Sequence, residues 1–226
     1  MIGHRGAAAL APENTLEGLA AAVAAGADLV EFDVCAGLFL GHPGRSGHGN
    51  PPTLDQALEL LAQRGAGAHI DLKLVGAEAE IAAAVRRHGL EEQAVVSSTS
   101  AHSLRRLAHE APRLTRAISY PRDHYGASNV RWPKPLVGAS AACLRPAMRA
   151  RLLPLLGAAR AGILSLHHTL VSRSLLAAVH ARRAHLLAWT VNDPEEVERL
   201  VRLGVDAIVS DDPGMALRVV ATMNPA

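Results

Sequence analysis

Two short segments place charged side chains two residues apart, a spacing suited to a strand. Glu31 and Asp33 form one pair, and Asp71 and Lys73 form the other. Because side chains two apart in a β-strand point to the same face, each pair projects together. Adjacent strands would then bring three carboxylates and one ammonium to a single site.

Three carboxylates in a partly dry site repel one another unless a cation neutralises them. Hard oxygen ligands favour Mg²⁺ or Ca²⁺ over softer metals, so the pattern indicates a divalent-metal site at Glu31, Asp33 and Asp71. The alternative is structural, because ordinary ion pairs with Lys73 or Arg5 also produce acidic clusters. The occurrence of both pairs on consecutive predicted strands favours the metal site.

Histidines near these segments supply groups for proton transfer. His4 is followed by Arg5 and Gly6 at the end of the first predicted strand. An imidazole can accept or donate a proton near neutral pH, and a guanidinium can bind a phosphate through two hydrogen bonds. His42, just beyond the acidic strand, is the second candidate for proton transfer, and His48 in the same loop is a weaker one.

The elements that must position these residues alternate between short β-like runs and amphipathic helical runs. Eight such alternations predict a closed parallel TIM barrel, a single domain over residues 1–226, with a doubly wound open sheet as the alternative. The predicted strands are Ile2–Arg5, Leu29–Val34, Ala68–Lys73, Ala94–Ser98, Leu114–Ser119, Gly162–His167, His185–Val191 and Asp206–Ser210.

Helix starts between these strands are marked by capping residues. Asn14 with Glu17, and Thr53 with Gln56, have the spacing of a capping box. Asp193-Pro194 combines a capping carboxylate with a first-turn proline, and Asp212-Pro213 repeats it before the last helix. Two stretches rich in Gly or Pro and charge are predicted loops: Gly41–Pro52 and Tyr120–Pro135.

Composition excludes several classes of partner. A net charge of +2 gives no concentrated basic character for binding nucleic acid. The most apolar region, Leu152–Leu166, is interrupted by Arg160 and is too short to span a bilayer. No signal peptide is visible, and Cys35 and Cys143 form no disulfide framework. We therefore expect a soluble cytoplasmic protein without an integral membrane segment.

The order of motifs resembles that of the glycerophosphodiester phosphodiesterase family. The resemblance runs from residue 2 to about residue 217 and is most specific in the first two motifs. The matching segments are His4-Arg5-Gly6, Pro12-Glu13-Asn14-Thr15, Glu31-Phe32-Asp33-Val34, Pro52-Thr53-Leu54, Asp71-Leu72-Lys73, Trp189-Thr190-Val191-Asn192 and Asp206-Ala207-Ile208-Val209-Ser210-Asp211.

The resemblance implies a TIM barrel that hydrolyses a small-molecule glycerophosphodiester to glycerol 3-phosphate and an alcohol, using Mg²⁺ or Ca²⁺. It implies that His4 and His42 form the acid–base pair. It also implies that the phosphate is bound by Arg5 and Lys73 and that Trp189 lines the substrate pocket. The metal ligands implied are Glu31, Asp33 and Asp71.

The chain departs from the family pattern in three places. Asp71 stands where the family usually has a glutamate, which shortens the side chain by one methylene. After Asp33, the usual acidic neighbour of the second histidine is absent, because Pro43 follows His42. The small inserted subdomain of the family is reduced to Gly44–Pro51.

Two alternatives to this activity remain. One is a related lyase of the phospholipase D type, which forms a cyclic phosphate from a lipid; the lack of a visible signal peptide and of a disulfide-forming pattern weighs against it. The other is a catalytically silent paralogue that binds phosphorylated ligands or a partner protein; Asp71 and the short loop after His42 favour it. Retention of histidines, carboxylates and cations together favours the enzyme.

Overall fold

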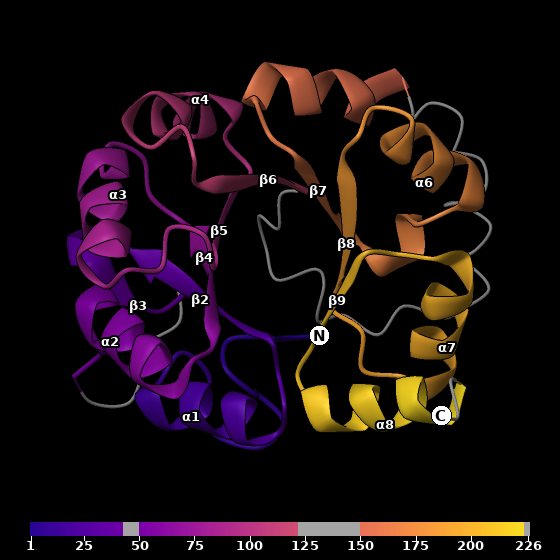
Figure 1. Cartoon of the computed structure of the whole chain (residues 1–226), viewed down its shortest axis with the longest axis horizontal. Helices are drawn as coiled ribbons and strands as arrows, with labels where there is room; N and C mark the ends of the chain where they lie inside the picture. The colour runs from indigo at the N-terminus through magenta and orange to yellow at the C-terminus, as the bar shows by residue number, and fades with distance from the viewer. Residues whose placement is uncertain (43–49, 122–149, 224–226) are drawn as a thin grey trace.

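A computed structural model describes residues 1–42, 50–121 and 150–223. Its strands form a closed parallel barrel within an outer layer of helices (Figure 1). The predicted TIM barrel is therefore confirmed. The barrel strands are β1 (Ile2–Gly3), β2 (Leu29–Cys35), β4 (Gly67–Leu72), β5 (Ala94–Ser98), β6 (Thr115–Tyr120), β7 (Ile163–His167), β8 (His185–Trp189) and β9 (Ala207–Ser210).

The two edges of the sheet join at the first strand. Ile2 on β1 pairs with Leu29 on β2 and with Val209 on β9, both in parallel. Every neighbouring pair around the ring is parallel, in the order β1-β2-β4-β5-β6-β7-β8-β9. An open doubly wound sheet would leave two unpaired edges, so closure excludes that alternative.

Helices follow the strands and cover the outside of the barrel (Figure 1). The one that precedes β7 is helical over residues 150–159 of the described chain. The others are α1 (Leu16–Ala24), α2 (Leu54–Arg64), α3 (Glu78–Arg87), α4 (Ala101–Glu110), α6 (Arg173–His180), α7 (Pro194–Leu203) and α8 (Pro213–Met223).

Capping residues begin several of these helices as the sequence predicts. Thr53 and Gln56 form the capping box of α2, and Asp193 caps α7 with Pro194 in the first turn. The expected box at Asn14 is wrong. Thr15 caps α1 by accepting a hydrogen bond from the Gly18 amide, because the Asn14 side chain is bound elsewhere.

Alternation along β2 separates two kinds of core. Val30, Phe32 and Val34 are buried in the layer between sheet and helices. Leu29 points to the other face and packs inside the barrel with Ile2, Leu187 and Val209, among others. Glu31 and Asp33 share this inner face with Leu29, because they follow it at intervals of two. The inside of the barrel therefore changes from apolar to acidic along β2.

The short strand that follows β2 was not predicted from the sequence. A short strand, β3 (Phe39–Leu40), pairs antiparallel with the end of β2, between a 3₁₀ turn η1 (Ala36–Leu38) and Gly41. The predicted loops at Gly41–Pro52 and Tyr120–Pro135, the shortened Gly44–Pro51 insertion and Cys143 lie wholly or partly outside the described residues. None of the helices in the described ranges combines the length and apolar character needed to cross a membrane.

Candidate active site

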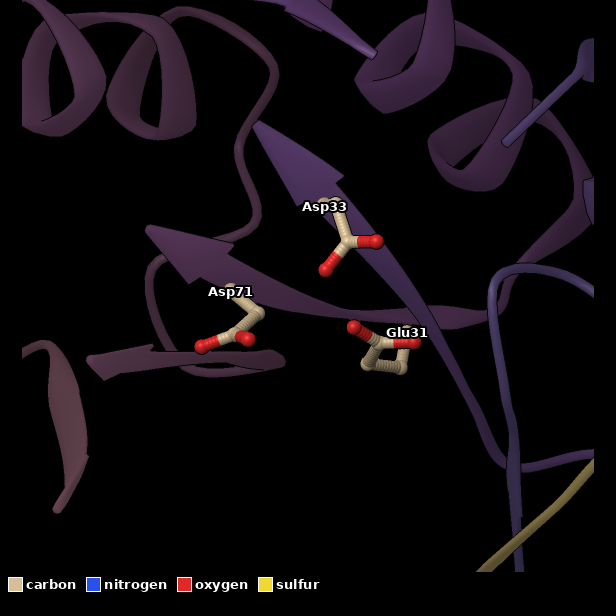
Figure 2. A group of neighbouring side chains, drawn as sticks. All are labelled: Glu31, Asp33 and Asp71. Carbon is tan, nitrogen blue, oxygen red and sulfur yellow. The ribbon is translucent and has the colours of Figure 1, made fainter. Parts of the chain in front are cut away.

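Three carboxylates converge at the ends of β2 and β4. Asp33 and Asp71 are direct neighbours in the parallel register, and Glu31 lies two residues before Asp33. One oxygen from each side chain lies within 4.8 Å of the others, and Figure 2 shows the three groups facing a common space. Glu31 and Asp33 are buried, and Asp71 is partly buried. The predicted convergence is therefore observed.

Two cations lie against this acidic group. The Lys73 ammonium contacts Asp71 and is 2.9 Å from an oxygen of Asp33. Arg5 places Nε 3.1 Å from the other Asp33 oxygen and donates from Nη1 to Glu13 at 2.9 Å. Both predicted phosphate-binding residues thus border the carboxylates, and both are engaged in ion pairs.

The chain leaves β1 through a tight turn that fixes Arg5. The amide of Arg5 donates to the Glu31 carboxylate at 2.7 Å, and the amide of Gly6 donates to the Glu31 carbonyl oxygen at 2.9 Å. Gly6 has φ +88°, and a Cβ there would lie 2.4 Å from the Gly18 carbonyl carbon. Only glycine combines that backbone conformation with such a close approach.

His4 is held by a carboxylate from the opposite end of the chain. Its Nδ1 lies 2.6 Å from Asp211, which follows β9, and its Nε2 lies 4.0 Å from Glu31. Despite burial, the hydrogen bond to Asp211 and the charge of Glu31 raise the pKa of His4. Asp211 itself accepts from Asn192 at 2.5 Å. His4 therefore has one nitrogen fixed and the other directed toward the acidic group.

Burial and the mutual repulsion of neighbouring carboxylates both act on this acidic group. Burial, together with the charge of Asp33, raises the pKa of Glu31 to about 7. Asp71 behaves oppositely: burial alone would raise its pKa, but Lys73 and Ser97 lower it. A carboxylate that resists ionisation beside two others is the setting in which a bound cation is stabilising. The donor set of three oxygens fits a divalent metal.

Asn14 braces the central carboxylate from the loop after β1. Its side-chain oxygen accepts from the Asp33 amide at 2.9 Å, and its side-chain nitrogen donates to the Asp33 carboxylate at 3.2 Å. Asn14 is buried and has φ +57°, a conformation that asparagine tolerates better than most residues. A role as a helix cap would not require this buried position.

His42 lies on the same end of the barrel as the carboxylates. It follows Gly41, whose amide donates to the Asp33 carbonyl oxygen at 3.1 Å. His42 is partly buried. This position suits the expected role in proton transfer, which stays a prediction.

Trp189 ends β8 and packs with the interior cluster of the barrel. Its ring meets that of His167, on β7, edge to face at a centroid distance of 5.3 Å. The indole Nε1 is buried and, among the described residues, has no hydrogen-bond partner. Trp189 therefore offers a buried donor that no described residue uses, at the end of β8.

Sequence reasoning assigned no role to His69, Ser97 or Asp211. His69 Nε2 lies 2.9 Å from the Ser97 hydroxyl, which donates to Asp71 at 2.7 Å. Burial lowers the pKa of His69 to about 4. Its position two residues before Asp71 was a usable signal, because period two places both side chains inside the barrel.

Comparison with known proteins gives one consistent result. A 24% identical relative from Caldanaerobacter subterraneus, a glycerophosphodiester phosphodiesterase, aligns over 97% of both chains. The crystal structure of a glycerophosphoryl diester phosphodiesterase from Silicibacter pomeroyi is 24% identical, with a TM-score of 0.74 over 98% of this chain and 92% of that one.

A phosphodiesterase from Oleispira antarctica, in complex with the product sn-glycerol 3-phosphate, has the same fold. It is 21% identical, with a TM-score of 0.71 over 97% of this chain and 95% of that one. The model of the glycerophosphoryl diester phosphodiesterase family matches residues 4–36 and 52–215. Because this match covers most of the chain, the protein belongs to the glycerophosphoryl diester phosphodiesterase family, a family of phosphoric diester hydrolases.

Proposed function

We propose that the protein hydrolyses glycerophosphodiesters to glycerol 3-phosphate and an alcohol, with a divalent metal held by Glu31, Asp33 and Asp71. The observation that carries this proposal is the convergence of the three carboxylates within 4.8 Å, in a chain of this family. The Oleispira relative with bound sn-glycerol 3-phosphate supports the product. Mg²⁺ and Ca²⁺ are the metals that three oxygen ligands favour.

A metal at this site supplies charge neutralisation and polarisation of the phosphoryl oxygens. The protein's own cations act beside it. Lys73 and Arg5 are already in contact with Asp33, so a phosphate bound there meets both positive charges. Donors placed before the reaction stabilise the charge that grows on the equatorial oxygens without rearranging.

Proton transfer falls to His4 and His42. Water attacks phosphorus while the bond from phosphorus to the alcohol oxygen breaks; alternatively, a neighbouring hydroxyl of the substrate displaces the alcohol first, and water then opens the resulting cyclic phosphate to glycerol 3-phosphate. One histidine accepts the proton of the attacking hydroxyl, and the other donates a proton to the departing alkoxide. Asp211 keeps His4 Nδ1 occupied, so Nε2 is the nitrogen available for exchange. Such assistance is typically worth about 10²–10⁴-fold in rate.

Substrate binding extends toward β8 through Trp189. Its buried, unpartnered Nε1–H can donate to a substrate hydroxyl, while the ring covers an apolar part of the ligand. Replacement by phenylalanine keeps the ring and removes the donor. We expect Trp189→Phe to raise KM more than it lowers kcat, because the donor acts in binding.

The direct test is incubation with glycerophosphocholine and Mg²⁺ or Ca²⁺, with coupled detection of glycerol 3-phosphate. We expect product with at least one metal and none after treatment with a chelator. A protein that binds the substrate but cleaves it with neither metal would instead be the silent paralogue. Asp71→Ala should weaken the response to metal, whereas Asp55→Ala, on exposed α2 surface, should not.

A second candidate function is the lyase that forms a cyclic phosphate from a lipid. It is favoured by one observation: the exposed large apolar side chains of the described residues lie at the active-site end of the barrel. Leu10 follows β1, Phe39 follows β2 and Val75 follows β4. Such a rim suits a substrate with an alkyl chain. Phosphorus NMR of the products of lysophosphatidylcholine distinguishes a cyclic phosphate from a monoester.

A further inference from the structure

Asp71 is held on both oxygens, and the two partners differ in kind. One oxygen contacts the Lys73 ammonium. The other accepts a hydrogen bond from Ser97 at 2.7 Å, across the β4–β5 register that pairs the two residues. Lys73 also contacts Asp33, so it pulls Asp71 toward its neighbour. Ser97 is therefore the contact that anchors Asp71 toward β5.

The Ser97 hydroxyl has a single proton, which it donates to Asp71. A hydroxyl donates once and accepts up to twice. Since an ionised carboxylate only accepts, the Ser97 hydroxyl must donate to Asp71 and accept from its other partner. That partner is His69 Nε2 at 2.9 Å, which must carry the proton. The hydrogen bonds thus run from His69, as donor, to Ser97, and from Ser97, as donor, to Asp71.

His69 and Ser97 are both shielded from solvent. His69 is 2% exposed and Ser97 is 1% exposed. His69 Nδ1 is buried with no hydrogen-bond partner among the residues described, so the contact with Ser97 is what orients the ring. Buried polar atoms are normally hydrogen-bonded. Since His69 uses only one of its two ring nitrogens, its contact with Ser97 is the interaction that points to a role for this buried side chain.

We propose that His69 and Ser97 are positioning residues that hold Asp71 in the orientation required of a metal ligand. His69 donates to Ser97 and so prevents its hydroxyl from rotating away from Asp71. The side chain of Asp71 is short, and this support from β5 sets where its carboxylate lies. The inference rests on the proposed function, because it takes Asp71 as a ligand.

Partners that orient a metal ligand typically contribute about 10–100-fold in metal affinity or activity. We therefore expect Ser97→Ala to weaken binding of Mg²⁺ or Ca²⁺, measured by calorimetry without substrate, by at least about 10-fold. The matched control is Ser98→Ala, the next residue of the same strand, whose buried side chain faces away from the barrel interior. Its metal affinity should equal that of the wild type.

Two amide replacements of His69 distinguish the roles of its two ring nitrogens. His69→Gln places an amide near Nε2 and can still donate to Ser97. His69→Asn reaches only as far as Nδ1. Metal affinity should stay within about threefold of wild type in the glutamine variant and fall as far as in Ser97→Ala in the asparagine variant. Equal affinities in both variants, at the wild-type level, would overturn the proposal.

A double variant tests whether the two residues act through one contact. Ser97→Ala combined with His69→Asn should bind metal no more weakly than either single variant, because the second change removes nothing further. Independent, additive losses would contradict a shared pathway. If His69→Asn does not fold, the comparison of Ser97→Ala with Ser97→Thr decides: affinity restored by threonine supports the proposal, and equal affinities contradict it.

Failure of the proposed function has a different signature. If the wild type binds no divalent metal, or if Asp71→Asn binds it as tightly as the wild type, then Asp71 is not a ligand and the metal site itself is wrong. If Asp71→Asn loses the metal while Ser97→Ala keeps it, only the positioning role is wrong. Circular dichroism and thermal unfolding of each variant confirm that the fold is kept.

Discussion

The imidazole of His4 and the carboxylate of Asp211 are joined at 2.6 Å, although 207 positions separate them in the chain. The contact lies at the active-site end of the barrel, where the first and last strands meet. Beside it, the backbone amide of His4 donates to the carbonyl oxygen of Ser210 at 2.9 Å. Asp211 is kept ionised: burial acts against this, but the hydrogen bond and charge of His4 lower its pKa. Closure of the barrel and orientation of His4 thus depend on the same pair of strands.

Asp211→Asn should lower kcat by about 10²-fold or more, because an asparagine amide can turn its NH₂ toward Nδ1 and reverse the tautomer of His4. The measurement is turnover of glycerophosphocholine at saturating metal. Asp212→Asn is the control, since Asp212 accepts from the Met215 amide at 2.8 Å in the first turn of α8. Equal losses in both variants would indicate a general disturbance of this segment.

His42→Ala should leave folding intact and cut turnover of glycerophosphodiesters by at least about 10²-fold. The reason is that an alkoxide is a poor leaving group, so loss of either proton-transfer partner slows the reaction. His102→Ala, at an exposed position of α4, is the matched control. Turnover of His42→Ala at the wild-type level would remove His42 from the mechanism.

Asn14 offers a test that is independent of catalysis. Asn14→Ala leaves the Asp33 amide buried without its partner, which should lower the free energy of unfolding by about 1–3 kcal/mol. Asn14→Gly loses the same hydrogen bonds but relieves the strain of φ +57°, so it should be less destabilised than the alanine variant. Urea unfolding measures both; an alanine variant as stable as the wild type would contradict this account.

Strand periodicity was enough to predict the acidic group. Glu31 and Asp33 repeat every two residues, as do Asp71 and Lys73, and the parallel register then brings the two strands' ends together. Nothing in local spacing could pair His4 with Asp211, because that contact requires the ring to close. The capping prediction at Asn14 failed for a similar reason: Thr15 next to it is an equally good cap, and the distant Asp33 amide claims Asn14.

Glu196 predicts how stability depends on pH. Burial alone would raise its pKa, but hydrogen bonds from Arg199 and His168 outweigh burial and lower the pKa to about 2. The bond from Arg199, which lies on the same helix, is 2.7 Å long. The bond with His168 is 2.6 Å long and ties α7 to η3 (His168–Leu170), the 3₁₀ turn after β7. Because the folded pKa lies below the unfolded one, the ionised group stabilises the fold above about pH 4.5 and loses this effect as pH falls toward 2.

Glu196→Gln removes this titration. The difference in unfolding free energy between wild type and Glu196→Gln should therefore shrink by about 2 kcal/mol between pH 5 and pH 3, measured by urea unfolding at each pH. Glu195→Gln, at the exposed neighbouring position in the same helical turn, should show no such convergence. A constant gap between wild type and Glu196→Gln across this range would mean that the contacts with Arg199 and His168 do not depend on the charge of Glu196.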